Sequence, residues 1–310
     1  MKPIDENDWQ KQSPYDRFSY FIALKVDRYK TLLATIEKLN LNSTVIAVSG
    51  NKHIFIFPPS LKSLRSTGGV FPFSGQNPYI LTAHYDRVEG SPGANDNSIA
   101  VFHLLRVAQI FAQRNIDKWI IIFTDKEELS QGESFEIQGS FTLAQKLKTW
   151  GLEKAKIFNF DACGNGDTFI FSTITDSVLK NSNSPNIAKV KSEIQQLRNH
   201  ALKTADNLRL EKVLLAPTPF CDDMGFLRAG YAAQTITMLP SSEAAQFGEV
   251  LRKNPEFANL LVSGEIKTSP ERRNLPATWK NLNNAGDTVS HLTPQFFEPV
   301  VQFIIELCKE

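Results

Sequence analysis

Short apolar runs alternate with longer amphipathic segments along most of this chain. Runs rich in β-branched and aromatic residues end at positions 84, 123 and 161, and polar residues follow each of them. Such runs are typical of strands that are buried on both faces of a largely parallel sheet. Helical spacing lies between and after them, over Ile99–Gln113, residues 141–150 and residues 187–210. The alternation predicts an α/β fold, a three-layer α/β/α sandwich on a mixed, mostly parallel sheet.

Further elements are predicted towards both ends of the chain. Residues 20–38 have the spacing of an amphipathic helix, and strand-like residues 44–49 and 53–57 flank a turn at positions 50 and 51, which indicates a hairpin. Additional strands are expected at residues 168–173, Val213–Ala216 and residues 233–238, before a last helix at residues 294–307. No linker-like stretch divides the sequence. We therefore expect a helical extension over residues 1–43, packed on a single domain at residues 44–310.

Residues that commonly bind metals stand at the ends of three predicted strands. His84 and Asp86 end the first, Glu127 and Glu128 follow the second, and Asp161 ends the third. Open α/β sheets bind ligands outside the carboxyl ends of their strands, so the three segments can converge. Since His84 and Asp86 are two positions apart, the carboxylate can hold the second nitrogen of the imidazole. The joint occurrence of these residues at three strand ends is a more specific indication of a metal site than any one of them.

Two candidate ligand segments, the loop with Asp96 and the Glu127-Glu128 pair, also have simpler structural interpretations. Asp96 lies in the loop at residues 93–97, directly before a helical segment, where a carboxylate is also favoured as a helix cap. The pair Glu127 and Glu128 also fits a solvated acidic turn. Consecutive side chains point in different directions, so the two glutamates are expected to differ in role.

Together the motifs resemble the M28 family of zinc exopeptidases, which includes leucyl-type aminopeptidases and the related glutaminyl cyclases. The resemblance extends over roughly residues 45–310. The matching elements are His84-x-Asp86, Gly-Ala-x-Asp-Asn at residues 93–97, Glu127-Glu128, Gly139-Ser140 and Asn159-x-Asp161. For the predicted sandwich it implies the zinc-exopeptidase fold, which is phosphorylase/hydrolase-like.

The resemblance also implies a set of metal ligands. Asp96 would bridge two zinc ions, His84 and Asp161 would complete one site, and Glu128 would serve the other. The family's last ligand is a histidine, but Asn283 stands at the matching position here. Since a carboxamide oxygen is a poor zinc ligand, this second site is in question.

The missing ligand has one possible replacement in the same region. His291 lies a little further along the chain and could bind zinc if the loop shifts locally. We therefore expect Asn283 or His291 as the fifth ligand, and one or two zinc ions as the cofactor.

Two catalytic roles and one substrate contact follow from the same resemblance. Glu127 would be the general acid/base, and Asp86 would orient His84. Asp222 resembles the aspartate of the family's Ser-Asp-His loop, and is implied to lie near the substrate. The implied function is an aminopeptidase that cleaves amino-terminal residues from a peptide or a small amide substrate.

Two alternatives stay open. The first is a single-zinc cyclase or deacylase on the same scaffold, although cyclases also use the final histidine that Asn283 replaces. The second is a degenerate binding protein without turnover, which the same substitution suggests. Against the second, so dense a cluster of carboxylates would repel itself without cations.

Composition narrows the class of protein. The 310 residues are 42% hydrophobic and 22% charged, with a formal net charge of +1. Because Lys and Arg are scattered, nucleic-acid binding is not expected. No apolar stretch is long enough to cross a membrane, and the first residues are too polar for a signal peptide. Cys163, Cys221 and Cys308 are odd in number and widely spaced, which predicts a cytoplasmic protein without disulfides. No pattern indicates an oligomeric state.

Overall fold

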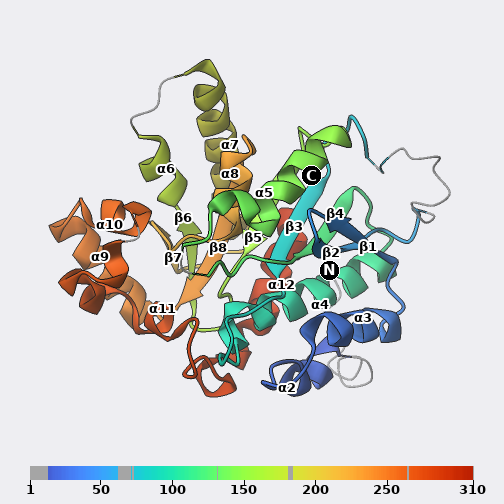
Figure 1. Ribbon diagram of the computed structural model, residues 1–310, viewed down its shortest axis with the longest axis horizontal. Coiled ribbons are helices and arrows are strands. Elements are labelled where there is room, and N and C mark those ends of the chain that lie inside the picture. Colours follow the sequence, from blue (N-terminus) through green and yellow to red (C-terminus); the bar gives the residue numbers. More distant parts are fainter. Residues whose placement is uncertain are drawn as a thin grey trace.

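A mixed sheet runs through the middle of the protein (Figure 1). The computed structural model describes residues 13–61, 71, 73–130, 132–180, 184–263 and 265–309. In these ranges the sheet has eight strands, in the order β1-β2-β4-β3-β5-β8-β6-β7. The strands are β1 Ser43–Val48, β2 Asn51–Ile56, β3 Tyr79–His84, β4 Trp119–Thr124, β5 Lys156–Phe160, β6 Thr168–Ser172, β7 Val213–Ala216 and β8 Ala233–Leu239.

The pairing of the strands confirms the predicted sheet. Strand β3 pairs in parallel with β4 and β5, β5 with β8, and β6 with β7. The pairs β1–β2, β2–β4 and β6–β8 are antiparallel. The hairpin expected on both sides of position 50 is therefore the β1–β2 pair at one edge of the sheet, and the sheet is mixed and mostly parallel, as predicted.

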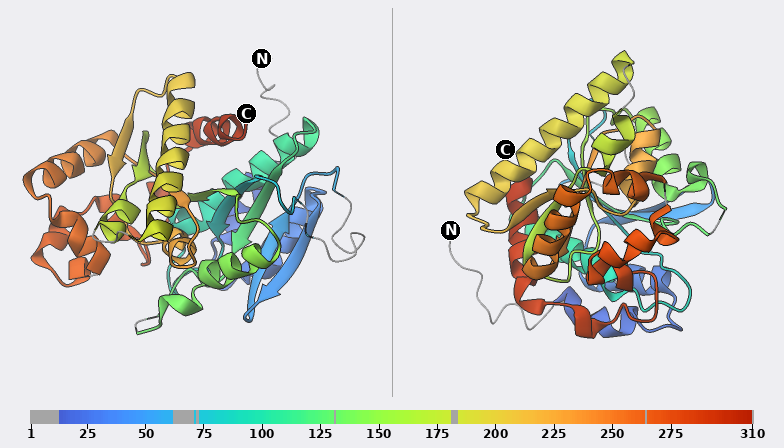
Figure 2. Two further views of the ribbon diagram at one scale, coloured as in Figure 1. Left: turned by 90° about the horizontal axis from the view of Figure 1, so that it is seen from above. Right: turned by 90° about the vertical axis from the view of Figure 1, so that its left-hand side faces the viewer.

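Helices cover both faces of this sheet. They are α2 Phe18–Phe21, α3 Arg28–Lys38, α4 Ile99–Gln113, α5 Gly139–Thr149, α6 Ile174–Leu179, α7 Pro185–Asn207, α8 Asp222–Arg228, α9 Ser241–Lys253, α10 Phe257–Ser263, α11 Ala277–Asn281 and α12 Phe297–Leu307. Short 3₁₀ turns include η1 Pro14–Arg17, η4 Phe135–Ile137 and η8 Pro294–Phe296. Figure 2 shows the long helix α7 beside α12, and α9 to α11 gathered at the end of the molecule opposite the β1–β2 hairpin. No helix in the described ranges is both long and apolar enough to cross a membrane.

Strand β4 shows why the two helical layers form. Trp119, Ile121 and Phe123 are buried in the core that includes residues of α3, α4, α7 and α12. The alternate residues Ile120 and Ile122 are buried in a second core with residues of α5 and α8. A strand whose successive side chains point to opposite faces must be covered twice, and full burial of each such side chain contributes about 1.5–3 kcal/mol. The three-layer α/β/α sandwich is thereby confirmed.

The helix predicted over residues 20–38 is instead two helices, α2 and α3, separated by a turn. Asp27 begins the second helix, because its side chain accepts a hydrogen bond from the amide of Lys30 at 3.0 Å. Arg87 binds the turn from outside, donating to the carbonyls of Ile22 and Leu24. The break comes from a local cap and from a distant arginine, and the apolar spacing does not reveal either.

Helices α6, α8, α9, α10 and α11 were not predicted. In α9 only Ala244 and Phe247 are buried, so the apolar pattern that would reveal it is weak. These two residues join a third core with Ile170 of β6 and Trp279 of α11. The last helix also differs from expectation, since its predicted first turn is the separate 3₁₀ turn η8.

Candidate metal centre

Three neighbouring parallel strands, β4, β3 and β5, end side by side, so their carboxyl ends lie next to one another. His84 is the last residue of β3 and lies opposite Thr124, the last residue of β4. Asp161 directly follows β5, which pairs with the other side of β3. The parallel register therefore brings the three sequence-distant segments together, as the pattern of strand ends predicts.

The predicted ligands gather around the imidazole of His84. Its Nε2 atom lies 3.1 Å from Asp96 Oδ1 and 3.8 Å from Asp161 Oδ2. Possible ligand atoms of His84, Asp96 and Glu128 all lie within 4.8 Å of one another. One nitrogen and several carboxylate oxygens at such separations suit a divalent cation such as zinc.

Two atoms of this group support a cation in particular. His84 Nε2 and Glu128 Oε1 are buried, and neither makes a hydrogen bond within the part of the chain that the structure describes. A buried polar atom without a partner is costly, by about 1–3 kcal/mol, so it calls for an explanation. A metal ion bound by both atoms would supply the missing partner.

Asp86 links the imidazole to the Glu-Glu segment. Its Oδ1 lies 3.3 Å from His84 Nδ1 and accepts a hydrogen bond from the amide of Glu127 at 3.2 Å. Its Oδ2 accepts one from the amide of Glu128 at 3.0 Å. One carboxylate therefore contacts the ring of His84 and holds the backbone that carries both glutamates, which is the placement expected of an orienting residue.

Glu127 lies beside the ligand group and stays partly open to solvent. Its side chain is 11% exposed, and Oε2 is 4.0 Å from His84 Nε2. The side chain of Gln138 donates to Oε1 at 3.4 Å. Burial raises the pKa of Glu127 well above its ordinary value, and the nearby charges of Glu128 and Asp161 add to the effect. A carboxyl whose pKa is raised in this way is suited to exchanging a proton with water.

The whole group favours protons or cations. Burial, together with the charge of Asp96, raises the pKa of Glu128 to about 9. Burial likewise raises the pKa of Asp161 to about 7. Burial alone would lower the pKa of His84, but its contacts with Asp86 and Asp96 raise that pKa well above the usual value. These shifts describe carboxylates that resist ionising together unless positive charge is close.

Asp96 is not the cap of helix α4. The residue at the N-cap of α4 is Ser98, with no side-chain cap hydrogen bond, and the Asp96 carboxylate lies against His84 instead. Asp287, from a segment almost two hundred residues later, accepts hydrogen bonds from the amides of Asn95 and Asp96 at 2.8 and 2.9 Å. Sequence reasoning did not assign Asp287 a role.

Two asparagines attach the same loop to the end of β5. Asn97 donates to the carbonyl of Phe160 and accepts from the amide of Ala162, at 2.8 and 3.2 Å. Asn95 accepts from the amide of Gly164 at 2.8 Å. The Asp96 loop and the Asp161 segment are therefore one hydrogen-bonded unit.

Comparison with known proteins agrees with this geometry. The model of Peptidase family M28 matches residues 69–296, well over half of the chain. The chain belongs to peptidase family M28. The resemblance found in the sequence motifs is thereby confirmed.

Solved structures of low sequence identity share the fold of this M28 chain. The leucine aminopeptidase precursor of Bacteroides thetaiotaomicron is 16% identical, with 96% of this chain and 95% of that chain covered and a TM-score of 0.59. The glutaminyl cyclase of Porphyromonas gingivalis is 14% identical, with coverages of 95% and 96% and a TM-score of 0.61. BSAP, a zinc aminopeptidase from Bacillus subtilis, is 15% identical, with coverages of 83% and 49% and a TM-score of 0.52. The zinc-exopeptidase fold that the resemblance implied is confirmed.

A curated relative matches over a shorter stretch. The putative endoplasmic reticulum metallopeptidase 1 of Schizosaccharomyces pombe is 29% identical over 105 residues. These residues are 33% of this chain and 12% of the relative. The chain therefore corresponds to a small part of that protein, and it spans about half the length of the Bacillus subtilis structure.

Three other candidate residues, Asp222, Asn283 and His291, lie outside the group formed by His84, Asp96 and Glu128. Asp222 begins α8, is fully buried, and accepts a hydrogen bond from Thr124 at 2.5 Å. Asn283 and His291 are exposed, and the Nδ1 atom of His291 lies 3.4 Å from the Thr288 hydroxyl. His291 is not among the grouped residues His84, Asp96 and Glu128. The structure brings four predicted ligands together and leaves the fifth at the surface.

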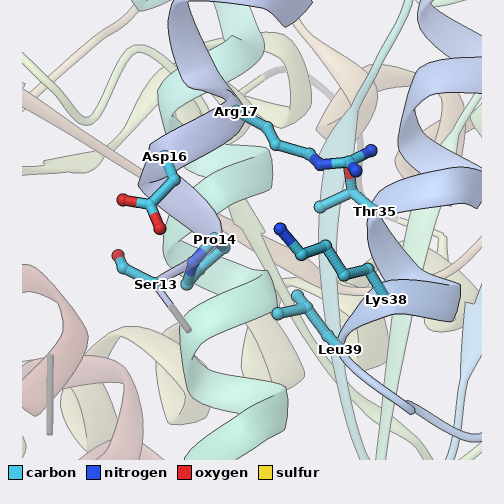
Figure 3. Close-up of a pocket in the computed structure, with 7 residues that line it drawn as sticks. All are labelled: Ser13, Pro14, Asp16, Arg17, Thr35, Lys38 and Leu39. Carbon is cyan, nitrogen blue, oxygen red and sulfur yellow. The ribbon is translucent and has the colours of Figure 1, made fainter. Parts of the chain in front are cut away.

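A small pocket elsewhere on the M28 fold contains none of these residues. It lies between η1 and α3, and Ser13, Arg17, Thr35 and Lys38 are among the residues that line it (Figure 3). Its lining holds one carboxylate, from Asp16, and no histidine. The candidate site is therefore the strand-end cluster and not this pocket.

Proposed function

We propose that this chain is a zinc-dependent hydrolase that removes amino-terminal residues from peptides. The observation that carries the proposal is the cluster of His84, Asp96, Glu128 and Asp161 at the strand ends, with Glu127, whose pKa is raised, beside it. Membership of peptidase family M28 supports peptide substrates, and zinc is named for the Bacillus subtilis structure of the same fold. The number of zinc ions per chain, one or two, is measured in the experiment described below.

The proposed chemistry divides the work between the cation and the side chains. Zinc held by the cluster would polarise the scissile carbonyl and lower the pKa of the attacking water. Glu127, in its ionised form, would take a proton from that water and deliver it to the leaving amine. Asp86 keeps His84 and the Glu127 backbone in register while the proton moves. The charge of Asp222 adds to the raised pKa of Glu127, and Asp222 is proposed to lie near the substrate.

A single-zinc cyclase acting on amino-terminal glutamine is the second candidate. It is favoured by the compactness of the ligand group, since the three residues His84, Asp96 and Glu128 suffice for one ion. The fold shared with the glutaminyl cyclase of Porphyromonas gingivalis is compatible with it. A cyclase releases ammonia from a glutaminyl peptide and leaves other amino-terminal residues intact, which separates it from an aminopeptidase.

The test is metal content per chain together with activity, for the wild type and for Asn283→His. Zinc is measured by elemental analysis after supplementation and dialysis, and activity on aminoacyl anilides and on a glutaminyl peptide. We expect zinc in the wild type and anilide hydrolysis that a chelator abolishes and zinc restores. Conversion of the glutaminyl peptide alone would identify a cyclase. Activity gained only in Asn283→His would identify the wild type as a binding protein that has lost its peptidase role.

We also propose a cytoplasmic location, since the three cysteines are free and buried in the structure. The Schizosaccharomyces pombe relative is named for the endoplasmic reticulum, so the location is tested directly by imaging a tagged chain. Signal in the endoplasmic reticulum would contradict the proposal.

A further inference from the structure

Arg28, the first residue of α3, points into the protein and not into solvent. It is 6% exposed and makes five hydrogen bonds. Nη1 donates to the carbonyls of Tyr85 and Asp86, at 3.2 and 3.0 Å. Nη2 donates to the carbonyls of Pro92 and Gly93, at 2.7 and 3.0 Å. Nη2 also donates to the hydroxyl of Ser98 at 2.7 Å.

These acceptors belong to the two loops that carry the ligands. Tyr85 and Asp86 directly follow His84, whereas residues 92–98 enclose Asp96. A guanidinium is a rigid planar fork, so atoms bound to its two ends are held at a fixed separation. Arg28 therefore fixes the backbone next to His84 relative to the backbone around Asp96.

The Asp96 loop is shaped around this arginine. Gly93 has φ +58°, and a Cβ atom there would lie 2.6 Å from Arg28 Nη2 and 2.5 Å from the carbonyl oxygen of Asp96. Any other residue would displace the guanidinium or the loop. Only glycine allows the close approach, for conformational as well as steric reasons.

The surrounding charges explain why a buried arginine is tolerated. Burial lowers the pKa of Arg28 to about 9, and Arg87 adds to that effect. The carboxylates of Asp86, Asp96 and Asp287 act in the opposite direction and keep the guanidinium charged at neutral pH. Arg28 also lies over the ring of Phe21, 5.0 Å from its centroid. The positive charge of Arg28 partly balances the negative charges of Asp86, Asp96 and Asp287.

We propose that Arg28 is a positioning residue for the metal site, which sets the distance between His84 and Asp96 and thereby the affinity for zinc. The helix α3 then belongs to the site and not to an accessory extension. This inference rests on the metal site of the proposed function.

The experiment compares zinc affinity in Arg28→Lys, Arg28→Met and the wild type. Each protein is stripped with a chelator, and its dissociation constant for zinc is measured at 25 °C by competition with a chromophoric chelator. We expect Arg28→Met to weaken binding about 10–100-fold, as loss of an outer-shell partner does. Arg28→Lys should lose less, because lysine keeps the charge but cannot hold both loops.

Arg198→Lys is the matched control. Arg198 is also buried, at 3% exposure, but it binds Asp176 and Gln234 and no residue of the metal loops. We expect it to lower the thermal midpoint while leaving zinc affinity within twofold of the wild type. Equal affinity in Arg28→Lys, Arg28→Met and the wild type would overturn the proposal, whatever happens to the midpoint.

A milder change decides the case if the arginine variants fail to fold. Ser98→Ala removes one acceptor of Arg28, and a smaller weakening of zinc binding is expected; unchanged affinity would count against the proposal. Absence of zinc binding in the wild type would overturn the proposed function and this inference together. Zinc binding in the wild type with unaffected variants overturns this inference alone.

Discussion

The Asp96 loop and the segment at residues 283–291 contact each other through Asp287 but present their candidate ligands very differently. The loop is tied to the rest of the protein by Arg28, Asp287 and Asn97. The segment is anchored by the buried Asp287, while Asn283 and His291 near its ends are exposed. The comparison teaches that four predicted ligands lie together before any cation binds, whereas the segment that should supply the fifth places Asn283 and His291 at the surface.

The difference has a physical basis in hydrogen bonding. A hydrogen bond that involves a charged group contributes about 1.5–3 kcal/mol, so several of them fix one loop conformation against thermal motion. Ligands held in this way bind a cation without a further ordering cost. The side chain of His291, with a long contact of 3.4 Å to the Thr288 hydroxyl, would have to be ordered by the cation itself.

The largest effect is expected for Asp96→Asn. It removes a carboxylate from the fixed half of the site, where Asp96 lies 3.1 Å from the imidazole. Zinc affinity should fall by more than the roughly 10–100-fold that loss of an outer-shell partner costs, and activity should disappear with it. Elemental analysis and the stabilisation of the thermal midpoint by zinc both measure the loss. Zinc content equal to the wild type would show that Asp96 is not a ligand.

Glu127→Gln should separate binding from chemistry. The amide keeps the size of the side chain but cannot transfer the proton, so the turnover number should fall roughly 10²–10⁴-fold. Zinc affinity should stay close to the wild type, because the cluster of His84, Asp96 and Glu128 is unchanged. The turnover number and the zinc affinity of the variant are both measured. Full turnover in this variant would refute Glu127 as the general base.

Asp287→Asn tests the connection between the two regions. Its carboxylate accepts two backbone amides, and an asparagine can accept only one of them without a clash between donors. An unpaired buried amide costs about 1–3 kcal/mol, so chemical denaturation should show a loss of that size. Zinc affinity should also decrease, by less than in Asp96→Asn. An unchanged free energy of unfolding would mean that the loop holds its shape without Asp287.

The pH dependence of stability follows from the raised pKa values. The pKa of Glu128 is raised to about 9 and that of Asp161 to about 7, both above their unfolded values near 4. Their contribution to stability is therefore complete below pH 4 and is lost as pH rises through 7 and 9. The thermal midpoint of chelator-treated protein should fall from pH 5 to pH 9 relative to that of the zinc-loaded protein. If the difference between the two thermal midpoints became smaller as pH rises, the raised pKa values of Glu128 and Asp161 would be contradicted.

The smallest effect is expected for His291→Ala. The side chain is exposed, so its loss should change zinc affinity and turnover by no more than about twofold. Metal titration and anilide hydrolysis are the measurements, with Asp96→Asn as the positive control. Loss of one zinc ion in this variant would show that the segment bends inward and completes a second site, and the comparison of the two regions would then fail.

Much of the fold was predictable because its elements are locally encoded. The helix expected over Ile99–Gln113 and the strand expected over Val213–Ala216 occur with those bounds. Their apolar spacing reflects burial that is nearly complete in the helix. Helix α9 was not predicted because it buries few residues, and the helix expected over residues 20–38 is divided at a turn that the Asp27 cap and Arg87 hold.

The sequence by itself determined the mixed α/β sheet, the family, and which side chains stand at the strand ends, because strand period and ligand spacing are local properties. Only the tertiary structure decided that Arg28 and Asp287 clasp the Asp96 loop, and that Asn283 and His291 stay at the surface. These contacts join residues that lie tens to almost two hundred positions apart. Their hydrogen bonds depend on how the elements pack against one another, and no local pattern of apolar and polar residues records that.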